Sequence, residues 1–185
     1  MKKNELRKKY KALRQTFSNN ELESMSQRII GNLISRFDLT GKNVSVFLPI
    51  TRFNEINSWL LINQIKANYY LPVMGEKESL KHVLYEGMQQ LKLNSWGILE
   101  PQYGTEINSA ELDFVIVPML TFDSNGYRVG YGKGYYDKFL VNCRTDCVFI
   151  GVYQFDEFEI IDDIHGADVA LDYCITPNQI IEFKK

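Results

Sequence analysis

Hydrophobic side chains recur at helical spacing through the first 37 residues of the chain. The stripe of the first segment consists of residues three or four positions apart, namely Leu6, Tyr10, Leu13 and Phe17. This spacing predicts an amphipathic helix over residues 4–17, because it places these side chains on one helix face. Ser18 and Glu21 have the spacing of a capping box and a second apolar stripe follows them, so another helix is predicted over residues 18–37.

Apolar runs of strand length alternate with helical stretches in the rest of the chain. The runs that predict strands cover residues 44–48, 69–73, 81–85, 114–118, 147–152 and 169–175. Asn54 is expected to cap a helix that includes Ile56 and Ile65, and a short helix is predicted over residues 134–141. Turn glycines precede and follow the 81–85 strand, which is expected at an edge of the sheet.

The alternation of strands and helices predicts an α/β fold. Right-handed crossovers between successive strands give a mainly parallel sheet with helices on both sides, a three-layer α/β/α arrangement. We expect a single domain over residues 1–185, made of an N-terminal helical pair (1–38) and an α/β body (42–185). Ligands of such sheets bind beyond the carboxyl ends of the strands, so a site is expected after Leu48 and after Pro118.

Composition narrows the classes of function. The chain has 185 residues, 45% of them hydrophobic, and a formal net charge of -2, which is typical of a globular protein and not of a polycationic nucleic-acid binder. No run of about 18 apolar residues predicts a membrane span. Two histidines are too few for an ordinary zinc centre, and the cysteines lack C-x-x-C spacing. We therefore expect a cytoplasmic monomer with reduced thiols at Cys143, Cys147 and Cys174.

Basic residues gather at the start of the chain. They are Lys2, Lys3, Arg7, Lys8, Lys9, Lys11 and Arg14. Such a cluster attracts a polyanionic ligand in some proteins and merely solvates a helix face in others. The residues taken alone favour the solvated face.

A segment rich in glycine and tyrosine follows the most apolar predicted strand. Residues 126–137 contain four glycines and four tyrosines in twelve positions. Glycines allow the backbone to approach a ligand closely, so that successive N–H groups converge on phosphate oxygens. The spacing fits neither a Walker A motif nor G-x-G-x-x-G, and a tight strand-to-helix turn is the alternative. The polar residues Arg128, Lys133 and Asp137 favour an anion-binding loop over that alternative.

These residues and several others resemble the 5-formyltetrahydrofolate cyclo-ligase family. The similar motifs are Lys3-x-x-Leu6-Arg7, Glu55-Ile56-x-Ser58, Trp96-x-Ile98-x-Glu100-Pro101, Val117-Pro118, Phe122-Asp123, Gly126-Tyr127-Arg128, the run from Gly130 to Asp137, Asp168-x-x-Leu171-Asp172 and Thr176-Pro177. Together they span nearly the whole chain. One departure is that Ala167, where the family commonly has histidine, precedes Asp168, while the histidine of this chain is His165. No function can be aligned to residues 75–93.

The resemblance implies a fold, a reaction and a set of site residues. The fold is that of the sugar-phosphate isomerase and CoA-transferase-like group, and the reaction is the ATP- and Mg²⁺-dependent cyclisation of 5-formyltetrahydrofolate to 5,10-methenyltetrahydrofolate. The implied catalytic residues are Lys133, Arg128 and Tyr135. The implied ATP-binding residues are Lys3, Asn4, Glu5, Leu6, Arg7, Arg128, Val129, Gly130, Tyr131, Gly132, Lys133, Gly134, Tyr135 and Tyr136. The implied substrate-binding residues are Leu48, Glu55, Trp96, Tyr131, Gly132, Lys133, Gly134 and Tyr135, and the implied magnesium ligands are Asp137 and Asp168.

Some of these assignments have a plainer alternative in the residues themselves. Asp137 is also what the first turn of a helix favours, and Glu55 is also ordinary capping chemistry for the helix predicted after it. Two other functions stay open: an ATP-using enzyme of the same fold with a non-folate acceptor, and a non-catalytic module that binds folate or nucleotide. All three functions predict small-molecule ligands and neither a nucleic acid nor a membrane as partner.

Overall fold

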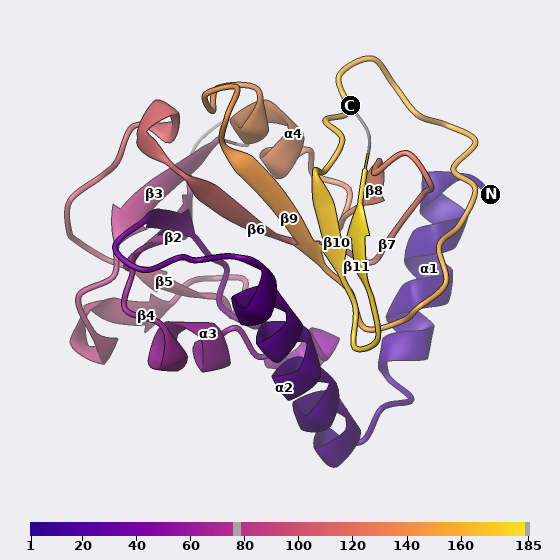
Figure 1. Ribbon diagram of the computed structural model, residues 1–185, viewed down its shortest axis with the longest axis horizontal. Coiled ribbons are helices and arrows are strands. Elements are labelled where there is room, and N and C mark those ends of the chain that lie inside the picture. The colour runs from indigo at the N-terminus through magenta and orange to yellow at the C-terminus, as the bar shows by residue number, and fades with distance from the viewer. Residues whose placement is uncertain (76–78, 184–185) are drawn as a thin grey trace.

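A computed structural model describes residues 1–75 and 79–183, which are arranged around a seven-stranded sheet (Figure 1). The strand order is β11-β10-β9-β6-β1-β2-β3. The strands of this sheet are β1 (Asn43–Ser45), β2 (Asn68–Met74), β3 (Leu80–Leu84), β6 (Phe114–Pro118), β9 (Val148–Val152), β10 (Tyr173–Ile175) and β11 (Ile180–Glu182). The inner strands pair in parallel, whereas β3 and β11 are antiparallel edges, which confirms the expected edge position of the third strand.

Helices cover both faces of the sheet, as predicted. On one face the buried side chains of α1 (Lys3–Arg14) and α4 (Tyr135–Leu140) pack with strand residues such as Val115 and Phe149. On the other face α2 (Asn19–Arg36) and α3 (Trp59–Gln64) pack with the alternate residues of the same strands, including Ile116 and Ile150. Successive strand side chains point to opposite faces, so each inner strand contributes to both cores and reads as a continuous apolar run.

The N-terminal helices begin where the sequence predicts. Ser18 caps α2 and exchanges hydrogen bonds with Glu21, which is the predicted capping box. In Figure 1, α1 and α2 lie well apart although they are consecutive, because each packs on a different face of the sheet. No helix among the described residues is long and apolar enough to cross a membrane.

The prediction that Asn54 caps a helix is wrong. Asn54 ends a short 3-10 helix, η1 (Thr51–Phe53), in the left-handed conformation with φ 46°, and α3 begins only at Trp59. Its side chain donates instead to the carbonyl oxygen of Arg14 over 2.8 Å. The tertiary contact with α1 outweighs the local capping preference of asparagine.

Two predicted strands are longer than the observed ones. The strand β1 ends at Ser45, although the amide of Val46 still donates to the carbonyl oxygen of Tyr70 in β2 over 3.0 Å, and Phe47 and Leu48 stay buried beyond the strand. Before β10, the amide of Leu171 bonds to the carbonyl oxygen of Gly126 instead of to a neighbouring strand. In both places the chain turns toward the glycine-rich segment or the space beside it.

Small elements outside the central sheet escaped prediction. They are the hairpin β4 (Leu91–Leu93) and β5 (Leu99–Pro101), the pair β7 (Thr121–Phe122) and β8 (Arg128–Val129), and the 3-10 helices η3 (Met88–Gln90) and η4 (Ser109–Glu111). Each has two or three residues, too few to show a period. Residues 76–78, within the stretch to which no function was aligned, lie outside the described residues.

Candidate functional site

A cavity of about 750 Å³ lies at the carboxyl ends of the inner strands. Leu48, just after β1, and Pro118, at the end of β6, both line it, as expected from the rule for parallel sheets. Further walls come from α1, from the end of β2, from the tip of the β4–β5 hairpin and from residues 130–137. Segments from the whole length of the chain therefore meet around one space.

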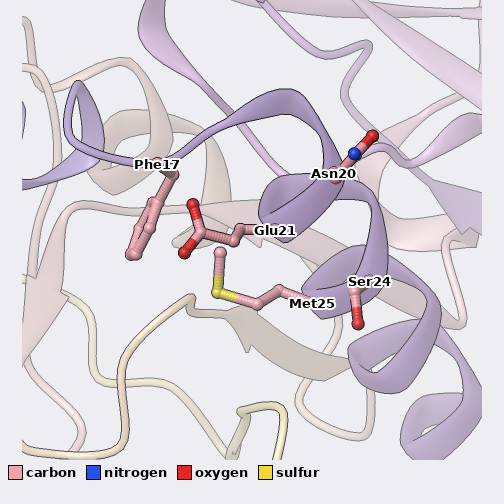
Figure 2. A pocket seen from close by; sticks show the side chains of 5 residues that line it. All are labelled: Phe17, Asn20, Glu21, Ser24 and Met25. Atoms are coloured by element: carbon pink, nitrogen blue, oxygen red, sulfur yellow. The ribbon is translucent and has the colours of Figure 1, made fainter.

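A second, smaller hollow of about 350 Å³ lies at the first turns of α2. Figure 2 shows the side chains of Phe17, Glu21 and Met25 turned toward one another there, with Asn20 and Ser24 pointing away. Glu21 already serves the helix cap. None of the predicted site residues lines this hollow, so the larger cavity is the candidate site.

The glycine-rich segment runs along one wall of the cavity, between β8 and α4. Gly132 and Gly134 have φ values of +97° and +69°, which side chains other than hydrogen rarely allow. Arg7 of α1 lies directly against this backbone, since its Nε donates to the carbonyl oxygen of Gly130 over 3.0 Å. A Cβ atom on Gly132 would lie 3.0 Å from that Nε. Glycine therefore allows α1 and the loop to approach each other.

Lys133 and Tyr135, two of the predicted site residues, line the cavity, and Lys133 is exposed. Tyr136 also lines the cavity, and its buried hydroxyl has no hydrogen-bond partner among the described residues. Burial raises the pKa of this hydroxyl, so Tyr136 stays neutral. An exposed cation above a glycine-rich backbone is an arrangement that suits phosphate.

Arg128 makes hydrogen bonds within the protein that the sequence does not predict. Its Nη2 donates to Oδ1 of Asp137 over 2.8 Å, and its Nη1 donates to the carbonyl oxygen of Val169. Burial lowers the pKa of the guanidinium and the Asp137 charge opposes that effect. Arg128 therefore links β8, α4 and the segment before β10 while lining the cavity.

The two predicted metal ligands lie on the same wall. Asp137 Oδ1 also accepts from the amide of Val169 over 3.2 Å, and Val169 follows Asp168 in the chain. Asp168 Oδ2 accepts from Lys3 Nζ and, over 2.7 Å, from the amide of His165. Among the described residues, Oδ2 of Asp137 and Oδ1 of Asp168 accept no hydrogen bond, so one oxygen of each carboxylate is available.

The described residues contain no cluster of three or more His, Cys, Asp or Glu side chains able to hold a metal. A cation bound by Asp137 and Asp168 would take its remaining ligands from water and phosphate. That ligand set fits Mg²⁺, which keeps several waters and commonly takes one or two carboxylates.

Glu55 is a further carboxylate of the cavity, and it is buried. It is 5% exposed and lines the cavity four residues before α3, so the helix-cap interpretation of Glu55 is wrong. Its Oε1 accepts from the Tyr131 hydroxyl over 2.5 Å, and its Oε2 accepts from the Ile50 amide over 2.8 Å. Burial raises the pKa of Glu55, while these two hydrogen bonds and the charge of Arg14 lower it.

Aromatic and apolar groups complete the cavity. Phe53 stacks on Tyr131 with ring centroids 5.1 Å apart, and Lys11 and Arg52 lie over the Phe53 ring. Trp96, at the hairpin tip, is 58% exposed and lines the opening. These surfaces, together with Leu48, suit a planar ligand.

The solvated-face interpretation of the basic N-terminus is wrong for part of the cluster. Lys3 and Arg14 are buried, and Arg7 is half-buried against the glycine loop. Lys3, Asn4, Arg7 and Lys11 line the cavity. Among the other predicted residues, Glu5, Leu6 and Val129 do not line it: Glu5 caps α1, and Leu6 and Val129 belong to the core.

Sequence reasoning did not identify Lys11, Arg14, Arg52 or Phe53 as part of the site. The clustering of basic residues in α1 was the available signal for Lys11 and Arg14, but a helical period does not say which face is covered by a distant segment. For Arg52 and Phe53 the sequence carries no recognisable signal, because they lie in a three-residue 3-10 helix.

Comparisons with known proteins agree in family and in fold. Residues 1–177 match the model of the 5-formyltetrahydrofolate cyclo-ligase family. The 5-formyltetrahydrofolate cyclo-ligase of Haemophilus influenzae is 31% identical over 159 residues, covering 80% of this chain and 81% of that protein. The one of Mycoplasma pneumoniae is 28% identical over 184 residues, covering 95% and 98%. The NMR structure of Aquifex aeolicus 5,10-methenyltetrahydrofolate synthetase is similar with a TM-score of 0.81 at 28% identity, covering 100% of this chain and 94% of that one.

Proposed function

The chain belongs to the 5-formyltetrahydrofolate cyclo-ligase family, and from this premise we infer that it converts 5-formyltetrahydrofolate to 5,10-methenyltetrahydrofolate with the use of ATP. One observation supports the mechanism above all: a glycine-rich loop with Lys133 and a buried carboxylate, Glu55, line the same cavity. The first suits a triphosphate and the second suits the N–H groups of a fused heterocycle.

Ring closure requires attack of N10 on the carbon of the N5-formyl group and loss of the formyl oxygen, which is a poor leaving group. We propose that the formyl oxygen attacks the γ-phosphorus of ATP and that ADP leaves. N10 then adds to the activated carbon, the N10 proton is lost to solvent, and the C–O bond breaks as inorganic phosphate departs. The balance is one ATP consumed, one ADP and one phosphate released, and one methenyl product formed.

The triphosphate is proposed to lie along residues 130–134. Backbone N–H groups of this loop and the Lys133 ammonium would face its oxygens, and Arg7 and Lys3 of α1 border the same space. Phosphoryl transfer is assisted mainly by positioning and charge neutralisation, so these groups need no strong base beside them. Arg128 is proposed to position the loop through Asp137 as well as to add positive charge.

Magnesium is proposed to bind through the available oxygens of Asp137 and Asp168. The two residues lie close together, because the backbone amide of Val169, the residue after Asp168, donates to the Asp137 carboxylate. When bound, magnesium would neutralise phosphate charge during the transfer. Lys3 pairs with Asp168 and Arg128 pairs with Asp137, so the chain already balances both carboxylates. These cations would hold the two side chains in place before ATP arrives.

The folate ring is proposed to lie against Leu48, Tyr131 and Trp96, with Glu55 accepting hydrogen bonds from its N–H groups. A carboxylate is acceptor-only, so it selects a donor pair over an acceptor pair. We also propose that residues 1–185 form a single working unit, that it is a monomer, and that it works in the cytoplasm, where its free cysteines stay reduced.

A direct assay tests the proposal. Purified protein is mixed with 5-formyltetrahydrofolate, ATP and Mg²⁺, and formation of the conjugated methenyl chromophore is followed by absorbance while ADP and phosphate are quantified. One ADP and one phosphate for each chromophore are expected. ATP consumption without the chromophore would indicate a different acceptor, and ligand binding without turnover would indicate a non-catalytic module; either result overturns the proposed reaction.

A further inference from the structure

Arg14, the last residue of α1, is a buried cation beneath the cavity. Its side chain is 3% exposed and it does not line the cavity itself. Its Nη1 donates to the hydroxyl oxygen of Tyr131 over 3.1 Å, and its Nη2 donates to the carbonyl oxygen of Met119. Nε has no partner among the described residues. A buried guanidinium is costly unless it is paired, so its retention needs a reason.

The described residues offer Arg14 no carboxylate in direct contact. The anion nearest to it through hydrogen bonds is Glu55, one step beyond Tyr131, whose hydroxyl donates to Oε1 of Glu55 over 2.5 Å. Arg14, Tyr131 and Glu55 come from α1, from the glycine-rich loop and from the segment before α3, respectively. Three distant parts of the chain thus form one chain of hydrogen bonds.

Arg14 sets the direction of the hydrogen bonds in this chain. Arginine is always protonated, so Arg14 must be a donor and the Tyr131 oxygen must accept from it. The single hydroxyl proton of Tyr131 then points to Glu55, and the Ile50 amide donates to the other oxygen of Glu55. Glu55 accepts both contacts, and these hydrogen bonds together with the positive charge of Arg14 favour the ionised carboxylate, whereas burial opposes it.

The backbone connects the same parts. The Asn54 side chain donates to the Arg14 carbonyl oxygen over 2.8 Å, and the Gln154 side chain donates to the Asn54 carbonyl oxygen. The segment that carries Glu55 is therefore fixed both to the end of α1 and to Gln154, the second residue after β9. The position of Glu55 depends on Arg14 through its backbone and through its side chain.

We propose that Arg14 is a positioning residue for folate recognition: acting through the Tyr131 hydroxyl, it keeps Glu55 ionised and oriented so that Glu55 accepts hydrogen bonds from the N–H groups of the folate ring. This inference rests on the proposed function, since the ligand of Glu55 is the folate of that reaction. Each oxygen of Glu55 uses one lone pair within the protein and retains another for the ligand. Arg14 itself touches no substrate.

The charge at Glu55 gives the inference a measurable signature. Among the described residues, the ionisable groups that face Glu55 are Arg14 from α1, Tyr131 from the loop and Tyr136 from α4. Burial raises the pKa of both tyrosines, so Arg14 is the only charged group among these three near neutral pH. Removal of its charge raises the pKa of Glu55, and a larger fraction of Glu55 is then protonated at a given pH.

The test uses titration calorimetry to measure the dissociation constants of 5-formyltetrahydrofolate, called folate below, and of ATP. These constants are compared between wild type and Arg14→Met. We expect folate affinity to fall about tenfold or more at neutral pH, equivalent to about 1.4 kcal/mol, with ATP affinity within about twofold of wild type. The loss should shrink as pH rises, because Glu55 then ionises without help. Arg14→Lys should restore part of the affinity, and Lys8→Met, on the outer face of α1, should match wild type.

A double-mutant cycle separates this role from simple packing. In a Glu55→Gln background the carboxylate charge is absent. Adding Arg14→Met to that variant should therefore lower the folate affinity further by less than about twofold. Wild-type folate affinity and pH dependence in Arg14→Met, or an equal loss in the Glu55→Gln background, overturns the inference. If Arg14→Met does not fold, Tyr131→Phe provides the test. It removes the hydroxyl that links Arg14 to Glu55, so the pH dependence of folate affinity should shift upward in the same way. A wild-type protein that does not cyclise 5-formyltetrahydrofolate would instead overturn the proposed reaction.

Discussion

The carboxylate of Asp137 accepts a hydrogen bond of 3.2 Å from the amide of Val169, the residue after Asp168, although 32 positions separate the two partners. This contact joins the helix after the glycine loop to the segment before β10. If both carboxylates hold magnesium, Asp137→Asn and Asp168→Asn should each lower turnover roughly tenfold or more and raise the Mg²⁺ concentration needed for half-maximal rate. A Mg²⁺ titration of the cyclisation rate measures this, and folate affinity should change little.

Asparagine is the right replacement, because its side-chain oxygen can still accept from Arg128 or from Lys3. Asp163→Asn is the matched control, since this aspartate also lines the cavity but its Oδ1 accepts from the Lys3 amide. A normal magnesium dependence in Asp168→Asn, together with a changed one in Asp137→Asn, would show that the two carboxylates do not act as a pair.

Lys133→Ala should raise the KM for ATP and lower kcat about tenfold or more while the protein stays folded. The reason is that Lys133 is exposed in the cavity and contributes to no core contact, so its loss affects phosphate more than stability. Steady-state kinetics and circular dichroism check both parts. Lys8→Ala, an exposed lysine of α1 outside the cavity, is the control, and wild-type kinetics in Lys133→Ala would refute the phosphate role.

Glu55→Gln should weaken folate binding roughly tenfold and leave ATP affinity nearly unchanged, because the amide offers one acceptor where the carboxylate offers two. The pKa of Glu55 is raised by burial, so folate binding by the wild type should weaken as pH falls through that raised pKa. In Glu55→Gln this part of the pH dependence should disappear. A loss of melting temperature with normal folate affinity would instead identify Glu55 as purely structural.

Gly132→Ala and Gly134→Ala form a matched pair. Both positions have positive φ, so each alanine should cost about 1 kcal/mol of stability. Only at Gly132 would the new Cβ approach Arg7, whereas nothing lies within 4 Å of a Cβ at Gly134. The KM for ATP should therefore rise clearly more in Gly132→Ala. Equal KM values in the two variants would argue against a role of the Arg7 contact in nucleotide binding.

Asp113→Asn should lower stability by about 1–2 kcal/mol at neutral pH without affecting catalysis. Partial burial raises the pKa of Asp113, but the Asn43 amide and Arg144 outweigh that effect, so its pKa is lowered. A group whose pKa is lowered in the folded state stabilises the protein at pH values above its unfolded-state pKa, which is about 3.9 for aspartate. This stabilisation is lost as pH falls through the pKa of the folded state. Thermal melts should thus converge for variant and wild type in acid.

Asp146→Asn is the control for that experiment. Asp146 also pairs with Arg144, over 2.7 Å, but its side chain is largely exposed, so its removal should cost less than about 0.5 kcal/mol. A stability difference between wild type and Asp113→Asn that persists unchanged at low pH would show that the charge of Asp113 is not responsible.

The sequence predicts the parts of the fold that depend on local patterns of residues. The capping box at Ser18, the strand Phe114–Pro118 and the edge position of β3 are all observed, because each depends on residues close in the chain. The expected place of the site, after Leu48 and Pro118, also coincides with the cavity, because it follows from the topology of parallel sheets.

What the sequence does not predict depends on distant partners. Asn54 has the composition of a helix cap, but its contact with Arg14, 40 positions away, decides its conformation. Arg14 carries a charge and is nevertheless buried, because Tyr131 and Met119 bring acceptors to it from the other half of the chain. A period of 3.6 residues shows which residues share a helix face and not what covers that face.

The placement of α1 also governs the order in which the molecule can assemble. This helix is synthesised before its partners, because its bonds reach Gly130, Glu159 and Asp168. Leu6 and Tyr10 are therefore not buried until those later segments have left the ribosome. We expect pulsed hydrogen exchange during refolding to protect the amides of β6 and β9 before those of α1. Earlier protection of α1 would contradict this order. The cavity would then be the last feature to form, so a truncated or stalled chain could hold a folded sheet and still bind no nucleotide.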